Sequence, residues 1–441
     1  MLVFLFVFEY LSAQSYHYTE TGLPVCYIET AKEVSISSKY EYVPARIRIE
    51  KGGMTLVDDS ASVRLHGNAT LYFPKKSFKL RFFDKVSPFD GMGKNRSFVL
   101  LANYSDKSLM KTSVGFRIGN EIDFRWVPRS EFVELVVNGE YVGNYQFAEN
   151  VKKGKNRLDI DDSGFLIEFD FDYKHSQHYF TTIVNGWNFT SKYPDDDEMV
   201  YSIFSYAENC MNAFEQALYS SVFPTDRSYT KLIDEESFAK WYYWKNLLQM
   251  EETNRYFLKN DNSTNSRIEM GPLWDFEWCL GVTDSHERPS HQHYFVNKLY
   301  FNRIVDDSLF MQRIYDLHQQ YGEHVRAAVI DHYSMLKDSL QLSQALNFQR
   351  WPILNEPISL AKIPIGSWEG EADADLQFFL EHYDWLTEQL SAYAEAGIHV
   401  ATPGAGKSDD TYYTLSGQRV SGTLRPGIYV KKGKKILLKI E

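Results

Sequence analysis

The sequence predicts an α+β protein with a β-rich N-terminal lobe, an α-rich C-terminal lobe and a small β tail. Three observations carry this prediction: strand patterns alternate up to about residue 172, apolar residues then recur at helical spacing up to about residue 400, and turn-punctuated strands return at the end. The chain has 441 residues, 44% of them apolar, so it can bury a substantial core and divide into two lobes.

The N-terminal half is predicted to be mostly antiparallel strands. Residues 77–84 (SFKLRFFD) alternate, so Phe78 and Leu80 share one face while Lys79 and Arg81 share the other. We expect this strand to bury one side and to present cations on the opposite side. Further strands are expected at 23–31, 42–53, 97–104 and 164–172, with one helix at 106–122.

The clearest local signal is a β-hairpin at residues 132–147 (FVELVVNGEYVGNYQF). Two apolar strand patterns meet there at Asn138 and Gly139. Both residue types tolerate the positive φ that a type I′ turn requires, so the sequence predicts a tight two-residue hairpin.

The C-terminal half is predicted to be helical. Asp234 precedes an apolar helical pattern and is the expected N-cap of that helix, while Gly397 ends the last one. The expected helices cover residues 196–221, 234–250, 308–336 and 378–397.

The two ends of the chain are predicted to serve export. Residues 1–14 combine an apolar run with small residues, as a signal peptide does, and no later apolar run is long enough to span a bilayer. This organisation gives a β-rich lobe at 15–172, an α-rich lobe at 173–400, a linker at 401–409 and a β tail at 410–441. We therefore expect a secreted or cell-surface protein without a transmembrane span.

The linker includes ATPGAGKS, which resembles a phosphate-binding P-loop. A P-loop requires a buried strand before it and a helix after it, so that backbone N–H groups and the helix dipole converge on the phosphates. A helical pattern precedes this string, and charges, aromatics and turn residues follow it. The sequence favours a Pro/Gly/Ser linker, with any nucleotide site lying elsewhere.

Composition excludes some classes of partner and site. The formal net charge is −12, which opposes non-specific binding to nucleic acid or anionic lipid. The cysteines Cys26, Cys210 and Cys279 are few and widely spaced, which favours neither a disulfide framework nor a zinc site.

The first candidate site lies at residues 64–82. A turn of small and polar residues follows His66 and precedes a strand whose polar face includes cations, with Lys76 and Lys79 nearby. Exposed N–H groups beside fixed cations are what a polyphosphate needs. The alternative is a solvated edge strand whose lysines discourage aggregation.

The second candidate site is the segment 269–281 (EMGPLWDFEWCLG). Asp275 and Glu277 lie two residues apart between Trp274 and Trp278, so in an extended segment both carboxylates project to one side. Paired carboxylates in a partly dry cleft can hold Mg²⁺ or divide acid and base roles. The alternative is a tryptophan-anchored turn with two surface acids.

Two further groups of polar residues complete the candidates. Glu251, Glu252 and Asn254 follow the end of a predicted helix and would complete a metal or general-base site if the fold brought them near Asp275. Their alternative is a solvated acidic turn. The second group, His286, His291 and His293, fits no helical zinc spacing and is predicted to be a polar loop.

Several of these segments together resemble one protein family. LPVCYIET, RLHGNAT, PKKSFKLRF, FVLLANYSDKSLMKT, the hairpin, GFLIEFD and GPLWDFEWCLG occur in the order found in the CotH-type protein kinases, named for a spore coat protein. The matches run from about Leu23 to Gly281. The resemblance implies an atypical kinase-like fold of two lobes with ATP and Mg²⁺ between them, and transfer of phosphate to Ser or Thr of a protein substrate that it does not identify.

The resemblance also implies roles for particular residues. It places Arg64, Lys76 and Lys79 near the phosphates and Glu149 at the lobe junction. Mg²⁺ ligation falls to Asp275, Glu277 and Asn254, and the catalytic position to Glu252 together with Asp275.

Three departures from the family pattern keep a second function open. His66 stands where the family has arginine, Glu277 where it has aspartate, and the segment at Glu252 is shortened with glutamate in place of aspartate. Because metal and base geometry tolerate errors of only about 0.5 Å, such changes can abolish transfer and leave binding. The alternative is a catalytically silent CotH-like surface binding or adhesion module. The tail resembles type IX secretion sorting tails, which implies attachment to the cell surface.

Overall fold

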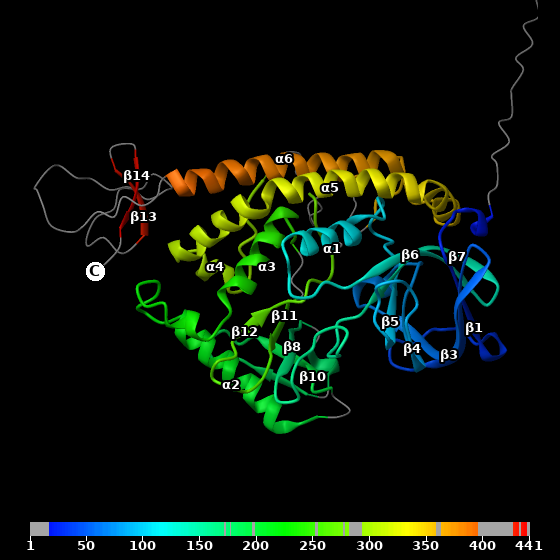
Figure 1. Ribbon diagram of the computed structural model, residues 1–441, viewed down its shortest axis with the longest axis horizontal. Coiled ribbons are helices and arrows are strands. Elements are labelled where there is room, and N and C mark those ends of the chain that lie inside the picture. Colours follow the sequence, from blue (N-terminus) through cyan, green and yellow to red (C-terminus); the bar gives the residue numbers. More distant parts are fainter. Residues whose placement is uncertain are drawn as a thin grey trace, which may run out of the picture.

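The computed structural model describes the chain in segments, with an α+β architecture as predicted. Strands dominate its N-terminal region and helices its C-terminal region (Figure 1). The described residues are 17–171, 173–176, 178–195, 199–251, 255–276, 278–281, 293–358, 363–395, 427–431 and 434–438.

The N-terminal strands form a closed barrel in the order β1-β2-β3-β4-β5-β7-β6. Neighbours pair antiparallel except β1 and β6, whose parallel pairing, with Val25 opposite Glu134, closes the barrel. Alternate apolar side chains such as Ile47 and Leu80 are fully buried inside it. The strands are β1 (Val25–Thr30), β2 (Val43–Lys51), β3 (Met54–His66), β4 (Ser77–Val86), β5 (Asn95–Leu101), β6 (Ser130–Val137) and β7 (Glu140–Glu149).

The predicted hairpin joins β6 and β7. Val137 pairs with Glu140, and the two residues between them, Asn138 and Gly139, have φ values of 48° and 80°. Positive φ at both positions is the requirement of a type I′ turn, so the hairpin prediction is confirmed.

A second sheet is separate from the barrel and has the strand order β12-β11-β8-β10-β9. Its central strand β8 pairs with β10 on one side and with β11 on the other. The sequence predicted β8 but not the other strands of this sheet, which are short, and the pairing of β8 with β11 is non-local. The strands are β8 (Phe165–Phe169), β9 (Tyr179–Thr181), β10 (Asn188–Tyr193), β11 (Arg255–Lys259) and β12 (Ile268–Met270).

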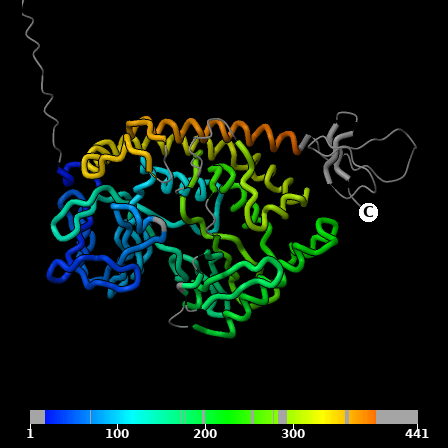
Figure 2. Tube along the Cα trace, turned by 180° about the vertical axis from the view of Figure 1, so that it is seen from behind, coloured from blue at the N-terminus to red at the C-terminus, as the bar shows by residue number. Residues whose placement is uncertain are grey.

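The helices pack in one large aromatic core around α3, whose residues from Phe238 to Leu247 are all buried. Asp234 caps it as predicted, because its carboxylate accepts a hydrogen bond from the Ser237 N–H at 2.7 Å. The long helices α5 and α6 lie side by side and run along the molecule to the barrel (Figures 1 and 2). The helices are α1 (Lys111–Glu121), α2 (Tyr201–Leu218), α3 (Glu235–Leu247), α4 (Phe301–Ile304), α5 (Ser308–Arg350) and α6 (Trp368–Glu395).

The C-terminal tail contains a β-hairpin of β13 (Gly427–Lys431) and β14 (Lys434–Leu438), which pair with each other in a sheet of their own. In Figure 1 it lies beyond the C-terminal end of α6. Every helix in the described part of the chain is too short or too polar to cross a bilayer.

Candidate functional site

A cavity of about 560 Å³ lies where one end of the barrel meets the second sheet and the segment after β12. The end of β3 and the turn after it form one wall, β4 and the end of β5 the next, and β8, β10 and β11 the opposite side. Two segments that the sequence singled out therefore line the same cavity: the turn after β3, and residues 274–276, called the WDF segment below. The polar lining relevant below comprises Lys39, Arg64, His66, Thr70, Lys79, Glu168, Asp170, Lys192 and Asp275.

One wall of the cavity is cationic because of the register of β3 and β4. Arg64 on β3 lies directly opposite Lys79 on β4, and His66 follows Arg64 by two residues on the same face. Lys192 on β10 lines the cavity from the second sheet. Burial, and then the charges of Arg64 and Lys192 among others, lower the pKa of Lys79 to about 8. The cations repel one another, which is the electrostatics of a site prepared for an anion.

Two polar atoms at the cavity wall also lack partners. The Arg64 Nε–H and the Thr70 hydroxyl are buried and have no hydrogen-bond partner among the described residues. Buried polar groups are almost always satisfied, so an orphaned donor and hydroxyl here indicate a ligand that supplies acceptors. Phosphate oxygens would meet that requirement.

Carboxylates line the side of the cavity that faces the cations. Glu168 on β8 forms an ion pair with Lys192 at 2.6 Å, and Asp170, two residues on, accepts a hydrogen bond from the Thr190 hydroxyl at 3.2 Å. The sequence analysis did not single out these two acids. The alternation of FLIEFD was the signal, because Phe165, Ile167 and Phe169 enter the helical core and leave Glu168 and Asp170 on the opposite face.

Asp275 lines the same cavity and is held in an unusual backbone conformation. Its φ is +69°, in the left-handed region that few residues other than glycine adopt. Its neighbour Phe276 is buried against Phe116 of α1, with ring centroids 4.9 Å apart, and against Gly115, where a Cβ would meet the Phe276 ring at 2.1 Å. The tight packing of Phe276 thus holds Asp275 in a strained conformation, as is common at functional sites.

The segment that ends at Glu251 runs beside the segment that follows Asp275. The Glu251 N–H donates to the Trp278 carbonyl at 2.7 Å, and the Leu280 N–H donates to the Leu248 carbonyl at 2.9 Å. Glu252, Asn254 and Glu277, three of the predicted site residues, lie outside the described residues. The backbone next to all three is nevertheless paired.

The Glu251 carboxylate serves the fold of this region. It forms an ion pair with Lys298 and accepts a hydrogen bond from the Tyr294 hydroxyl at 2.5 Å. Burial alone would raise the pKa of Glu251, but these bonds outweigh it and lower the pKa below its usual value. Glu251 therefore ties the segment to the chain at 294–298.

The structure places Lys76 and Glu149 away from the cavity. Lys76 precedes the first residue of β4 and donates to the carbonyls of Leu71 and Phe73 at 2.6 and 2.5 Å. β4 begins at Ser77, and Lys79 is the first lysine on the face that Ser77 shares, so Lys79 lines the cavity instead.

Glu149 ends β7 and is almost fully buried, with 1% of its surface exposed. It accepts a hydrogen bond from the Arg129 N–H at 3.1 Å and lies 3.7 Å from the Arg157 Nε. Burial raises the pKa of this carboxyl, and the neighbouring arginines partly offset that rise. Its position, opposite Phe98 of β5, is inside the barrel end rather than on the cavity wall.

Some of the side chains at the cavity are possible metal ligands. Within the described ranges, no three His, Cys, Asp or Glu side chains gather closely enough to hold an ion by themselves. Asp170 and Asp275 line the same cavity and provide the carboxylate oxygens that Mg²⁺ prefers. Mg²⁺ usually takes only one or two carboxylates and completes its shell with water and phosphate, so these donors fit a magnesium–polyphosphate complex.

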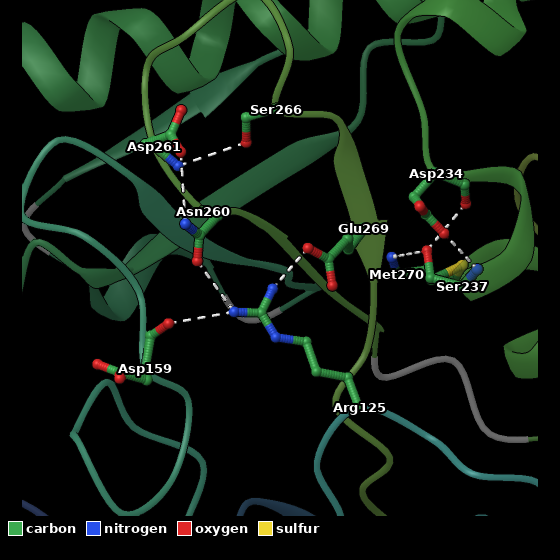
Figure 3. Close-up of polar contacts among 9 residues, drawn as sticks. All are labelled: Arg125, Asp159, Asp234, Ser237, Asn260, Asp261, Ser266, Glu269 and Met270. Carbon is green, nitrogen blue, oxygen red and sulfur yellow. Dashed lines mark hydrogen bonds and ion pairs between the residues drawn. The ribbon is translucent and has the colours of Figure 1, made fainter.

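A second hollow of about 300 Å³ near the start of α3 is less suited to phosphate. Its arginine, Arg125, forms an ion pair with Glu269 at 2.5 Å and donates to the Asp159 carbonyl and the Asn260 side chain, as Figure 3 shows. The Asp234 carboxylate already occupies the N-terminus of α3 there. The cations of this hollow are thus neutralised by carboxylates of the chain, whereas the larger cavity has an excess of cations on one wall.

Comparison with known families gives one match. The family described as CotH kinase protein matches residues 63–384, a span that includes the end of β3, the whole of β4, the second sheet and most of α6. Every described residue of the cavity wall except Lys39 and Tyr40 lies within it. A search of curated proteins finds no match.

Proposed function

This chain belongs to the CotH kinase protein family, and on that premise we propose that it is a protein kinase that transfers phosphate from ATP to Ser or Thr of a protein substrate. One observation carries the proposal furthest. The cation-lined wall of Arg64 and Lys79 and the carboxylate of Asp275 belong to one cavity of about 560 Å³. That volume suits a nucleotide, and the two walls have the charges that a magnesium–triphosphate complex needs.

In this proposal the barrel and the helical region are the two lobes of a kinase-like fold. Lys79, Arg64 and Lys192 hold the phosphate oxygens and neutralise the charge that develops during transfer. Asp275 and Asp170, with Glu277 and Asn254, hold Mg²⁺. Mg²⁺ supplies charge neutralisation and orientation of the phosphates when it is bound.

The proposed catalytic base is Glu252. It would accept the proton of the attacking hydroxyl, so that the hydroxyl oxygen forms the new P–O bond while ADP leaves with its electron pair. The backbone bond between Glu251 and Trp278 supports this assignment, because it joins the segment that ends at Glu251 to the segment that follows Asp275. Phe276, buried against α1, would fix the position of Asp275 during the reaction.

We also propose that the protein acts outside the cytoplasm, through the leader at 1–14 and the tail at 410–441. The second function that an observation favours is a silent binding module. Phe171 and Tyr201 are 68% and 66% exposed, and exposed aromatic rings suit glycan or protein contacts. His66 and Glu277, which replace family residues, are compatible with that reading.

Purified full-length chain incubated with γ-labelled ATP, with and without Mg²⁺, tests the proposal. We expect label to transfer to the chain itself or to a mixture of generic protein substrates only when Mg²⁺ is present, and to disappear in Asp275→Asn. Calorimetry with ATP in the same samples separates binding from transfer. Binding without transfer would favour the silent module, and absence of both would refute the kinase assignment.

A further inference from the structure

His66 lies at the cavity wall and is a candidate for contact with a ligand. It is the last residue of β3, two residues after Arg64 and on the same face, and it faces the cavity from within the cationic wall. The residue is half-buried, and no described residue hydrogen-bonds the imidazole. An imidazole that faces a cavity without a protein partner is available to a ligand.

The groups that face His66 come from every side of the cavity. Cations line the cavity from β3, β4, β10 and the loop before β2, and the acids Glu168, Asp170 and Asp275 line it from β8 and from the segments after β8 and β12. Glu168 is already paired with Lys192, and Asp170 with the Thr190 hydroxyl. The immediate surroundings of His66 are therefore dominated by positive charge.

Burial and this charge together keep the free imidazole neutral. Burial in the first place, and then the charges of Lys79, Arg64, Lys192 and Lys39, lower the pKa of His66 to about 3. The same charges oppose protonation only until an anion neutralises them. A polyphosphate in the cavity would reverse the sign of the local potential and would favour the imidazolium, which donates from both ring nitrogens.

We infer that His66 is a phosphate-binding residue of this cavity and that it binds as imidazolium, so that nucleotide binding takes up one proton from the solvent. The inference rests on the proposed nucleotide site. It adds that pH regulates this site, because the affinity for the nucleotide rises as the pH falls. An arginine at this position would be charged in the free and the bound protein, and its binding would show no such coupling.

The direction of the pH dependence of binding follows from the linkage between proton binding and ligand binding. The bound state holds one more proton than the free state at any pH between the free and the bound pKa of His66, and lowering the pH within that window strengthens binding. The effect reaches at most about tenfold in affinity per pH unit for one proton. Lys79, with a pKa of about 8, is already largely protonated at pH 6.5 and contributes little there.

The test is calorimetric titration of the full chain at pH 6.5 with Mg²⁺–ATP and, separately, with inorganic tripolyphosphate. Two buffers of low and high ionisation enthalpy, neither of them phosphate, give the number of protons taken up. ATP and tripolyphosphate also titrate near this pH, so the measured quantity is the difference between wild type and His66→Asn. We expect the wild type to take up about one proton more.

Two variants control the comparison. His332→Asn removes another histidine whose pKa burial lowers, to about 4, at a site on α5 where its ring contacts the Ser113 hydroxyl at 2.8 Å. It should leave the proton uptake unchanged. His66→Arg should abolish the extra uptake, keep binding strong at pH 8, and lower the melting temperature of the free protein by adding a permanent charge beside Arg64 and Lys79.

The outcomes separate this inference from the proposed function. Equal proton uptake by wild type and His66→Asn with both ligands overturns the role of His66, while Mg²⁺–ATP binding still supports the kinase. Extra uptake with tripolyphosphate but no Mg²⁺–ATP binding supports His66 and overturns the nucleotide site. No binding of either ligand at any pH between 6 and 8 overturns both.

Discussion

The backbone N–H of Glu251 donates a hydrogen bond to the carbonyl oxygen of Trp278 at 2.7 Å. The two residues are far apart in the sequence, and each is next to a residue that the sequence analysis assigned to catalysis or metal binding. A second bond, from the Leu280 N–H to the Leu248 carbonyl, extends the pairing. The chain after α3 and the segment around Trp278 are therefore hydrogen-bonded to each other, so a change that displaces either segment is expected to displace both.

The contrast between Lys79 and Lys76 gives a prediction about binding. Lys79→Met should weaken Mg²⁺–ATP binding by roughly 10- to 100-fold, the value of a charge-assisted hydrogen bond, and should leave the free protein at least as stable because repulsion by Arg64 and Lys192 is relieved. Calorimetric titration and melting curves measure both effects.

Lys76→Met is the matched control. Its ammonium donates to the carbonyls of Leu71 and Phe73, so its loss should lower the free energy of unfolding by about 1–3 kcal/mol and leave affinity almost unchanged. If Lys76→Met lost affinity as strongly as Lys79→Met, the assignment of phosphate binding to the cavity wall around Lys79 would be wrong.

Lys79 also shows which features of the structure can be predicted from the sequence. Alternation in SFKLRFFD placed Lys79 on the polar face of β4, and Asn138-Gly139 predicted the hairpin, because both signals are local. The closure of the barrel by parallel pairing of β1 with β6, and the pairing of β8 with β11, join residues about 90 to 110 positions apart. No local pattern encodes such partners, so the strand order of the second sheet, and the place of Glu168 and Asp170 at the cavity, became visible only in the structure.

Stability in acid gives a prediction that is independent of function. His382 is fully buried, its Nε2–H donates to the Asn246 carbonyl at 2.5 Å, and burial lowers its pKa to about 4. An unfolded histidine titrates near pH 6.5, so between pH 6.5 and 4 the unfolded chain binds more protons than the folded one. The corresponding stability is present above pH 6.5 and is lost as the pH falls towards 4.

His382→Gln should therefore reduce the loss of stability that occurs as the pH falls. The difference in free energy of unfolding between pH 7 and pH 4 should shrink by up to about 3 kcal/mol, as measured by denaturant titration at both pH values. Identical pH dependence in the variant and the wild type would show that His382 is not held neutral.

The ATPGAGKS string gives a negative prediction. It lies in 401–426, outside the described residues, after a helix rather than after a buried strand. Lys407→Ala should leave Mg²⁺–ATP affinity unchanged, because a linker without a strand and a helix does not aim its amides at phosphate. A large loss of affinity in this variant, measured beside Lys79→Met, would move the nucleotide site to the linker.

The tail is predicted to be a separable export or anchoring module. β13 and β14 form a sheet of their own, which gives no reason for the barrel or the helical core to depend on them. Deleting the residues after Gly404 should leave the melting temperature of the remaining chain nearly unchanged and should alter where the protein accumulates in the cell. Unfolding of the truncated chain would instead make the tail part of the core.

Asp275 gives the sharpest test, because the two roles open to it predict opposite effects on the free protein. As a metal ligand it is a partly buried carboxylate kept charged beside aromatic rings, so Asp275→Asn should lose Mg²⁺–ATP affinity and phosphate transfer while the free protein keeps or gains stability. Asn also tolerates the φ of +69° found there, so the substitution adds little backbone strain. As a structural acceptor in the tryptophan turn, the same change should destabilise the free protein and spare binding. Melting curves without ligand, beside calorimetric titration with ATP in the presence and absence of Mg²⁺, decide between them: unchanged Mg²⁺–ATP affinity in a folded variant would exclude Asp275 as the metal ligand.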